Sequence, residues 1–325
     1  MTDHDFYDDA PAKVDAKAGV YGLDQAAGKY KYPAPPGIEI PKGWRGWMRM
    51  TNLAGAFSDQ KALQIWLEWK AMMGLRVADG LLFEEWMAEP VEQLDAAGQK
   101  AVAAEYGERA RKAVHADQAA RRGTARHKMM DDYLTHGYET GTRSMQAQRE
   151  SALKAMDECG LEVMDSEFRV WHPLAGGVVG TSDVKVMCRW TGQVGILDWK
   201  TQAKFFTWQN TAGQLYGYDS APWIWRGPDT SDGFWERQGE NTLLGHPEGQ
   251  FPGQRVALVA HMPQAPGPGQ LPVEIHEVPM AYGEAVLVTA ARNVELRSVG
   301  RSTAVGRRPA GIRPRVAVAS RAIAG

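Results

Sequence analysis

Residues 180–201 read GTSDVKVMCRWTGQVGILDWKT, and this stretch decides the fold. It holds most of two runs rich in β-branched and apolar residues, 178–187 and 194–199, with a turn at residues 191–193 between them. Runs of that length around a glycine-containing turn are typical of a β-hairpin. The sequence therefore predicts two antiparallel strands here, with another strand before them at residues 167–171.

Charged residues gather at one end of this hairpin. Because side chains alternate along a strand, Asp198 and Lys200 point to the same side at the end of a buried strand. Antiparallel pairing places Asp183 beside Asp198, where two carboxylates repel unless a cation lies between them. The pattern favours a divalent-cation site, with an ammonium group that can orient water or offset phosphate charge. The competing interpretation is an exposed ion pair, since an isolated Asp-x-Lys triplet is usually no more than that.

Residues on two flanking helices favour the same region. His127 lies on a predicted helix upstream of the strands, although a lone helical histidine more often packs or faces solvent than binds a ligand. Gln214 and Tyr218 lie one turn apart on a predicted helix downstream, so they share a face. Each signal is weak alone, but the order and spacing of all of them together are specific.

The order of these motifs resembles the PD-(D/E)XK nuclease superfamily, in its RecB-like branch of phage-type and CRISPR-associated exonucleases. In that branch a helical Gly-x-x-x-His supplies a histidine that binds metal, matched here by Gly123 and His127. A Gly-x-x-Asp strand supplies an aspartate that binds metal, matched by Gly180 and Asp183. The resemblance spans residues 123–218.

The resemblance also assigns the later motifs. An Asp-x-Lys strand supplies the second acid and the catalytic lysine, here Asp198 and Lys200, and the carbonyl of Trp199 would be a further metal ligand. A Gln-x-x-x-Tyr helix lines the site, here Gln214 and Tyr218.

Two further features concern the same family. Glu167 is similar to an acid often found at the start of the first strand in these nucleases, which implies a supporting role. Iron–sulfur members of the branch use four cysteines, and this chain has only Cys159 and Cys188. We therefore expect no iron–sulfur cluster.

The resemblance implies a metal-dependent deoxyribonuclease, more an exonuclease than an endonuclease, acting in phage or cellular DNA recombination, replication or repair. His127, Asp183 and Asp198 would hold Mg²⁺ or Mn²⁺, and Lys200 would position the attacking water. A histidine ligand favours Mn²⁺. The expected partner is DNA with a free end or a single-stranded region.

Basic residues near the motifs are candidates for DNA contact. They are Arg122 and Arg126 on the His127 helix and Lys204 after the catalytic strand, although a solvated helix face explains each equally well. Residues 301–325 contain six arginines and no acid, which indicates a basic tail that could hold DNA. Tryptophans at positions 208, 223, 225 and 235 could stack on bases, although most tryptophans pack in cores.

Two other functions compete with this interpretation. One is a nonhydrolytic DNA-binding or assembly module that keeps the nuclease fold, against which the intact motifs argue. The other is a glycosidase that uses Asp183 and Asp198 as acid and base. The neighbouring Lys200 fits that chemistry poorly.

The chain divides into regions by composition. Residues 1–43 predict a flexible arm, residues 44–120 a helical region packed on the core, residues 121–299 the nuclease core, and residues 300–325 a basic disordered tail. The expected fold class is α/β. The core would be restriction-endonuclease-like, a mixed central sheet flanked by helices, with a mainly helical N-terminal extension.

Overall composition is that of an ordinary globular protein. The chain has 325 residues, of which 44% are hydrophobic and 23% charged, with a net charge of −2. No apolar run approaches the roughly 20 residues that cross a bilayer, and the first residues do not resemble a secretory signal. Two cysteines make no disulfide framework, so we expect a cytoplasmic protein, in the host cytoplasm if a phage encodes it.

Overall fold

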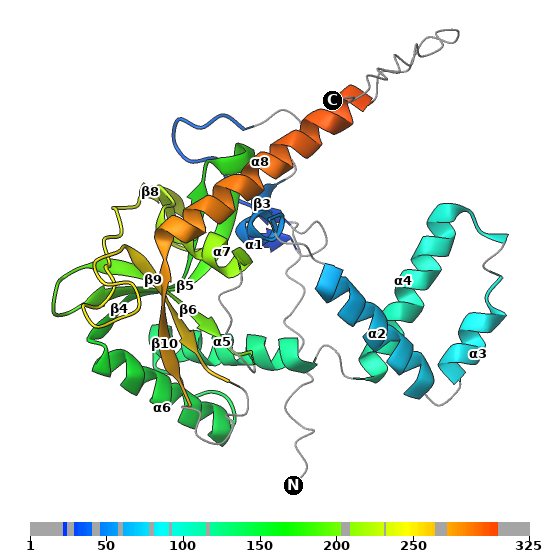
Figure 1. Cartoon of the computed structure of the whole chain (residues 1–325), viewed down its shortest axis with the longest axis horizontal. Coiled ribbons are helices and arrows are strands. Elements are labelled where there is room, and N and C mark those ends of the chain that lie inside the picture. Colours follow the sequence, from blue (N-terminus) through cyan, green and yellow to red (C-terminus); the bar gives the residue numbers. More distant parts are fainter. Residues whose placement is uncertain are drawn as a thin grey trace, which may run out of the picture.

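The computed structural model has α/β architecture: within the residues that it describes, ten strands form one mixed, mostly antiparallel sheet flanked by helices (Figure 1). The described residues are 22–24, 29–40, 46–57, 61–77, 81–90, 93–114, 118–202, 209–230, 232–263 and 272–304. The α/β class predicted from the sequence is thus confirmed.

The centre of the sheet is the predicted meander of strands. β4 (Leu161–His172) pairs antiparallel with β5 (Val178–Cys188), which pairs antiparallel with β6 (Val194–Lys200). A 3₁₀ turn (Leu174–Gly176) joins β4 to β5. Both faces of β6 are buried, and this explains why its sequence is an apolar run rather than an alternating pattern.

The sheet extends on both sides of this centre. β6 pairs in parallel with β9 (Val256–His261), and β10 (Glu274–Pro279) pairs antiparallel with β9. Beyond β4 lie β7 (Trp223–Arg226) and β8 (Phe234–Arg237), an antiparallel hairpin. This hairpin lies within residues 221–253, a stretch that contains many Gly, Pro and Asp residues.

β5 changes its partner partway along one side, and this fork positions the candidate site. β3 (Trp47–Arg49) pairs in parallel with Val178 and Val179, whereas β6 pairs with the segment 184–187. β4 occupies the other side of β5 throughout, so β3 and β6 share one side. Residues 180–183 of β5 therefore lie in a gap between two neighbouring strands.

The N-terminal strands correct a prediction. The sequence predicted a flexible arm over residues 1–43, but β1 (Gly22–Asp24) pairs with β2 (Lys29–Lys31), and β2 pairs with β3. Tyr32 is 1% exposed and packs against Trp225 and Trp235. Aromatic burial therefore binds residues 29–40 to the sheet, which the Pro- and Gly-rich composition did not indicate.

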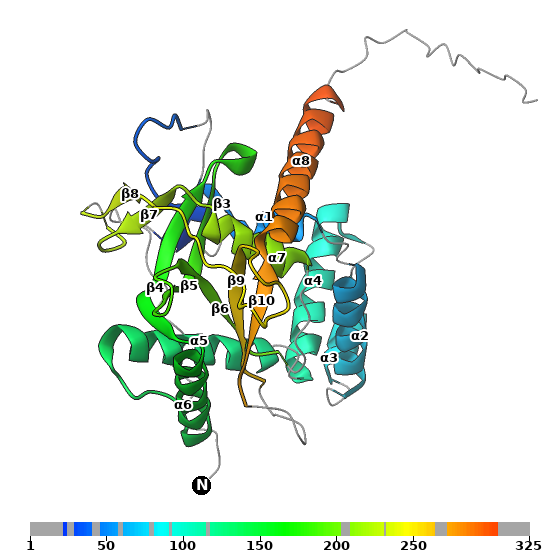
Figure 2. The same ribbon diagram turned by 60° about the vertical axis from the view of Figure 1, so that its left-hand side comes forward.

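Helices cover both faces of the sheet (Figures 1 and 2). α1 (Met50–Gly55), α7 (Gln209–Asp219) and α8 (Met280–Ala304) pack in one hydrophobic cluster. α5 (Gln118–His136) and α6 (Arg143–Glu158) pack in a second cluster on the opposite face. Ile196 belongs to the first cluster and its neighbour Leu197 to the second, as expected for a central strand.

The remaining helices form a group of their own. α2 (Lys61–Val77), α3 (Leu81–Ala88) and α4 (Ala96–Ala113) share a small cluster and stand to one side of the sheet in Figure 1. Gly74 lies inside α2, and its missing side chain lets α4 approach closely at Ala110. Within the predicted region 44–120, α1 thus belongs to the cluster on the sheet, whereas α2, α3 and α4 share a cluster of their own among the described residues.

The C-terminal boundary also differs from the prediction. The sequence predicted that the core ends at residue 299, but α8 continues to Ala304, and residues 305–325 of the predicted tail lie outside the described part of the chain. None of the described helices combines the length and the apolar character that crossing a membrane requires.

Candidate active site

The gap in the sheet holds Asp183 against the backbone of the next strand. At this end of the hairpin, the last paired residues of β5 and β6 are Val184 and Leu197. Asp183 and Asp198 are their immediate neighbours in sequence, just beyond the paired region. Past that point the Oδ2 atom of Asp183 accepts a hydrogen bond from the buried N–H of Trp199, at 2.8 Å. The carboxylate thus takes the place of a strand neighbour and is fixed beside the end of β6.

Asp198 and Lys200 form the second part of the site. They lie two residues apart on β6, so their side chains share a face, and Lys200 Nζ is 2.5 Å from Asp198 Oδ2. Asp198 is 2% exposed, whereas the Lys200 side chain is 20% exposed. A buried carboxylate thus holds an ammonium group that still reaches solvent.

The carbonyl of Trp199 points into the same gap. Lys200 O accepts a hydrogen bond from Met262 N, so the polar backbone groups of Lys200 face β9. Neighbouring residues of a strand direct their backbone groups to opposite sides. The N–H and C=O of Trp199 therefore face the side of Asp183.

His127 reaches the gap from α5. Its Nδ1 atom lies 3.3 Å from Asp183 Oδ2. One turn earlier, a Cβ at Gly123 would stand 2.9 Å from the hydroxyl oxygen of Thr201, so the absent side chain lets the helix approach the end of β6. Burial lowers the pKa of His127, but the carboxylates of Asp183 and Asp198 outweigh that effect and raise it to about 9.

Glu167 joins His127 and Asp183 through an unusual backbone conformation. One ligand atom from each of the three lies within 4.8 Å of the others. Glu167 has a φ of 49°, which is rare for a residue with a side chain and concentrates at functional sites. Its neighbours then face opposite sides of the sheet: Ser166 donates to Asp131 of α5, and Phe168 packs in the cluster on the other face.

The carboxyl groups in the gap lie close enough to change one another's pKa values. Burial, opposed by Lys200 and reinforced by Asp183, raises the pKa of Asp198 to about 6. Burial and the neighbouring Asp183 and Asp131 raise the pKa of Glu167 to about 7. Burial also acts against ionisation of Asp183, but His127 outweighs it and holds that pKa below its ordinary value.

Lys200 remains a cation in this setting. Burial lowers the pKa of its ammonium group, but Asp198 and then Asp183 outweigh that effect and raise it. The site therefore presents one ammonium beside two acids, Asp198 and Glu167, whose pKa values burial and the neighbouring Asp183 raise. A divalent cation would relieve this repulsion.

The opposite face of the gap is formed by α7. Gln214 Nε2 donates to the hydroxyl of Tyr218 at 2.8 Å, so these two residues meet as their spacing predicts. Tyr218 is 2% exposed, and burial, with Asp198 next in effect, raises its pKa well above the ordinary value. It therefore stays protonated at neutral pH.

A small cavity of about 150 Å³ opens beside this pair. It is lined by residues from β2, β3, α1, β5 and α7, namely Tyr30, Arg49, Met50, Thr51, Gly180, Thr181, Gln214 and Tyr218. Tyr30 and Arg49 come from strands that the sequence did not predict, and no motif marked them. A larger hollow of about 1090 Å³ near Trp190 contains none of the predicted site residues.

The predicted DNA-contact residues separate in the structure. Arg122 is exposed on α5. Arg126 is 6% exposed and its Nε donates to Gln148 at 2.7 Å, so it joins α5 to α6 and does not present its guanidinium to a partner. Lys204 lies outside the described residues.

The tryptophans proposed for base stacking serve the core instead. Trp225 and Trp235 are 5% and 6% exposed and pack edge to face with each other. The half-buried Trp223 packs against the same cluster. Position 208 lies outside the described residues.

Comparison with known proteins gave no match that would identify a function. No protein-family model matches the chain, and no curated protein matches it either.

Proposed function

We propose that the protein is a metal-dependent DNA exonuclease of the RecB-like branch, with a restriction-endonuclease-like core around the gap in its sheet. The observation that carries the proposal is the convergence of Asp183, Asp198, Lys200 and His127, from three separate elements, beside one interruption of strand pairing. Each of these residues matches a motif of that branch in the sequence.

The chemistry of the donors fits Mg²⁺ or Mn²⁺. Carboxylate and backbone oxygens suit hard cations, and one imidazole favours Mn²⁺. Asp183, Asp198 and His127 would hold the ion, with the Trp199 carbonyl as a further ligand and Glu167 in support. When bound, the cation supplies a water of lowered pKa and neutralises charge on the phosphate.

Other side chains around the gap would act on the water and on the DNA. Lys200, held as a cation by Asp198, would position the attacking water and offset the charge of the pentacovalent phosphate. Gln214 orients the hydroxyl of Tyr218, and together they line the cavity into which a backbone segment of DNA would enter. Arg122 on α5 would contact phosphates of the strand.

The experiment is degradation of end-labelled linear DNA, single- and double-stranded, and of a covalently closed circle of the same sequence. Reactions contain Mg²⁺, Mn²⁺ or EDTA. We expect loss of linear DNA only with a metal, and an intact circle, because an exonuclease requires an end. Cutting of the circle would make the enzyme an endonuclease, and no cutting under any metal would overturn the proposal.

The alternative function is a nonhydrolytic DNA-binding or assembly module. It would show binding to the same DNA, by mobility shift in EDTA and in Mg²⁺, without any product. Retention of Lys200 beside Asp198 favours hydrolysis, because binding alone gives no reason to bury a carboxylate against an ammonium in a gap of the sheet.

A further inference from the structure

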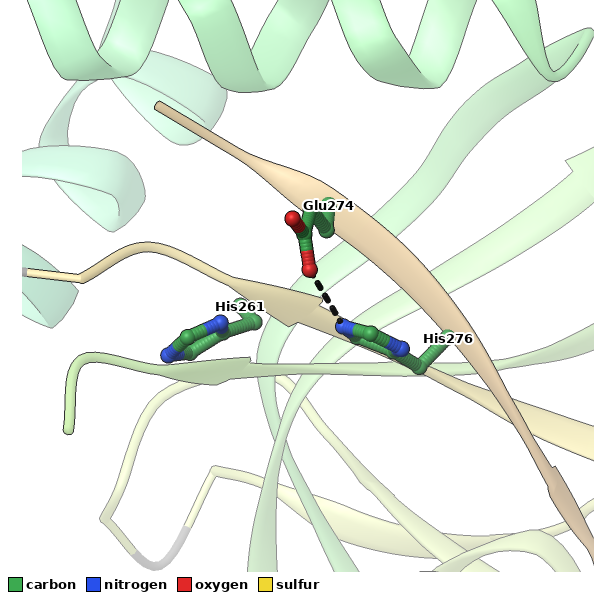
Figure 3. Close-up of side chains that lie close together, drawn as sticks. All are labelled: His261, Glu274 and His276. Atoms are coloured by element: carbon green, nitrogen blue, oxygen red, sulfur yellow. Dashed lines mark ion pairs between the residues drawn. The ribbon is translucent and has the colours of Figure 1, made fainter. Parts of the chain in front are cut away.

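A second group of metal-ligating side chains lies on the outer strands of the sheet, apart from the residues assigned above. His261 is on β9, and Glu274 and His276 are on β10 (Figure 3). One ligand atom from each lies within 4.8 Å of the others. No short motif marks these residues in the sequence, because the pairing of two strands brings them together.

The strand register explains why the side chains meet. Glu274 lies directly opposite His261 in the antiparallel pair, and His276 is two residues further along, on the same face as Glu274. Side chains in these positions of a sheet are direct and diagonal neighbours. Figure 3 shows Glu274 and His276 facing each other with His261 beside them, and His276 Nε2 lies 3.2 Å from Glu274 Oε2.

A backbone contact prepares His261 as a ligand. Its Nε2 atom is 2.8 Å from the carbonyl oxygen of Gln202, and a carbonyl can only accept, so Nε2 carries the proton. The lone pair of the neutral ring is then on Nδ1. Histidines that bind metal commonly donate their other N–H to a backbone carbonyl in this way, which fixes the tautomer and the ring orientation.

We propose that His261, Glu274 and His276 bind a transition-metal ion of the Zn²⁺ class. Two imidazoles and one carboxylate form a typical three-ligand zinc set, with the fourth position open to water. Ligand atoms around such an ion are about 3.4 Å apart, which follows from bonds of about 2.1 Å, so small side-chain rotations complete the geometry. His261 is buried while Glu274 and His276 are about one-third exposed, which gives the ion a path from solvent.

The bound ion would act on the edge of the sheet. It would fasten β10, through Glu274 and His276, to His261 of β9. His261 in turn holds Gln202, two residues after Lys200, and is paired in register with Lys200 itself. The proposal thus describes a stabilising site that also braces the end of the strand bearing Lys200.

The test measures Zn²⁺ binding to the full-length, tag-free chain carrying Asp183→Asn, so that the first site contributes little. Zinc per chain is counted by mass spectrometry of the metal after gel filtration, and affinity is measured by competition with a chromophoric chelator. We expect one Zn²⁺ per chain, a higher Tm with Zn²⁺, and a four-coordinate visible spectrum when Co²⁺ replaces it.

The variants decide whether these three residues hold the ion. His276→Ala and Glu274→Gln should each weaken Zn²⁺ binding at least tenfold and remove the rise in Tm. The matched control is His246→Ala, which removes an exposed histidine elsewhere and should leave binding unchanged. His276→Gln serves if the alanine variant does not fold. Unchanged affinity in folded His276 and Glu274 variants, or no zinc in the parent chain, would overturn the proposal.

Discussion

Gly180 lies against the ring of Tyr218 so closely that a Cβ at this position would stand 2.3 Å from it. The glycine of the Gly-x-x-Asp motif therefore has a packing reason: it lets α7 lie on β5 just where the strand lacks a neighbour. This contact places the Gln214 and Tyr218 pair over the gap that holds Asp183.

Gly180→Ala should destabilise the fold, because the methyl group would force apart β5 and α7. Overpacking of this kind costs about 1–3 kcal/mol, or several degrees in Tm. Thermal unfolding measures the change. Gly239→Ala is the control, since a Cβ there meets no atom within 4 Å. Equal Tm values for the two variants would contradict the close packing.

Glu167 should make stability depend on pH in the absence of metal. Its pKa is about 7 in the folded chain against 4.5 for the ordinary side chain, so the stability it contributes is complete below pH 4.5. That contribution is lost as the pH rises through 7. In EDTA, Glu167→Gln should therefore gain stability relative to the parent between pH 4.5 and 8. Urea unfolding at several pH values measures this gain, and a constant difference would refute the assignment.

If the proposed metal site is right, His127→Ala should lower cleavage with either metal and reduce the expected advantage of Mn²⁺ over Mg²⁺, because the imidazole would be the ligand that favours Mn²⁺. Initial rates at saturating concentrations of each metal give the ratio. His136→Ala, an exposed histidine on the same helix, is the control and should keep the parent ratio. A ratio unchanged by His127→Ala would remove the residue from the metal site.

Arg122 and Arg126 should behave differently although they lie one turn apart on α5. Arg122→Ala should weaken DNA binding in EDTA and reduce its salt dependence, while Tm stays unchanged. Arg126→Ala should lower Tm by several degrees, because it leaves Gln148 without its buried donor, and should hardly alter binding by the folded fraction. Filter binding at two salt concentrations measures the first effect. The reverse result would show that the interface lies elsewhere.

The sequence predicted the parts of this molecule that depend on local pattern. The strands around the turn at residues 191–193 formed as expected, and strand alternation explains why Asp198 and Lys200 share a face. The residues around Glu167 gave no indication of its left-handed backbone conformation. The burial of Arg126 depends on α6, which lies beyond any local window.

The features that the sequence did not predict depend on contacts between distant parts of the chain. Residues 29–40 read as an arm because Pro and Gly interrupt them, yet their tyrosines are buried against tryptophans about 190 or more residues away in the chain. The interruption of pairing along β5 arises because strands from distant parts of the chain share one of its sides. The pattern of apolar and polar residues within one strand cannot predict such a gap.

The most direct test of the account is single-turnover cleavage of end-labelled DNA by Asp198→Asn and Lys200→Ala, measured beside DNA affinity and Tm. The control is Lys154→Ala, an exposed lysine paired with Glu158 on α6. We predict that the rate falls about 100-fold or more in both site variants, with affinity and fold retained and the control unaffected. Full cleavage rates in folded Asp198 and Lys200 variants would contradict the account.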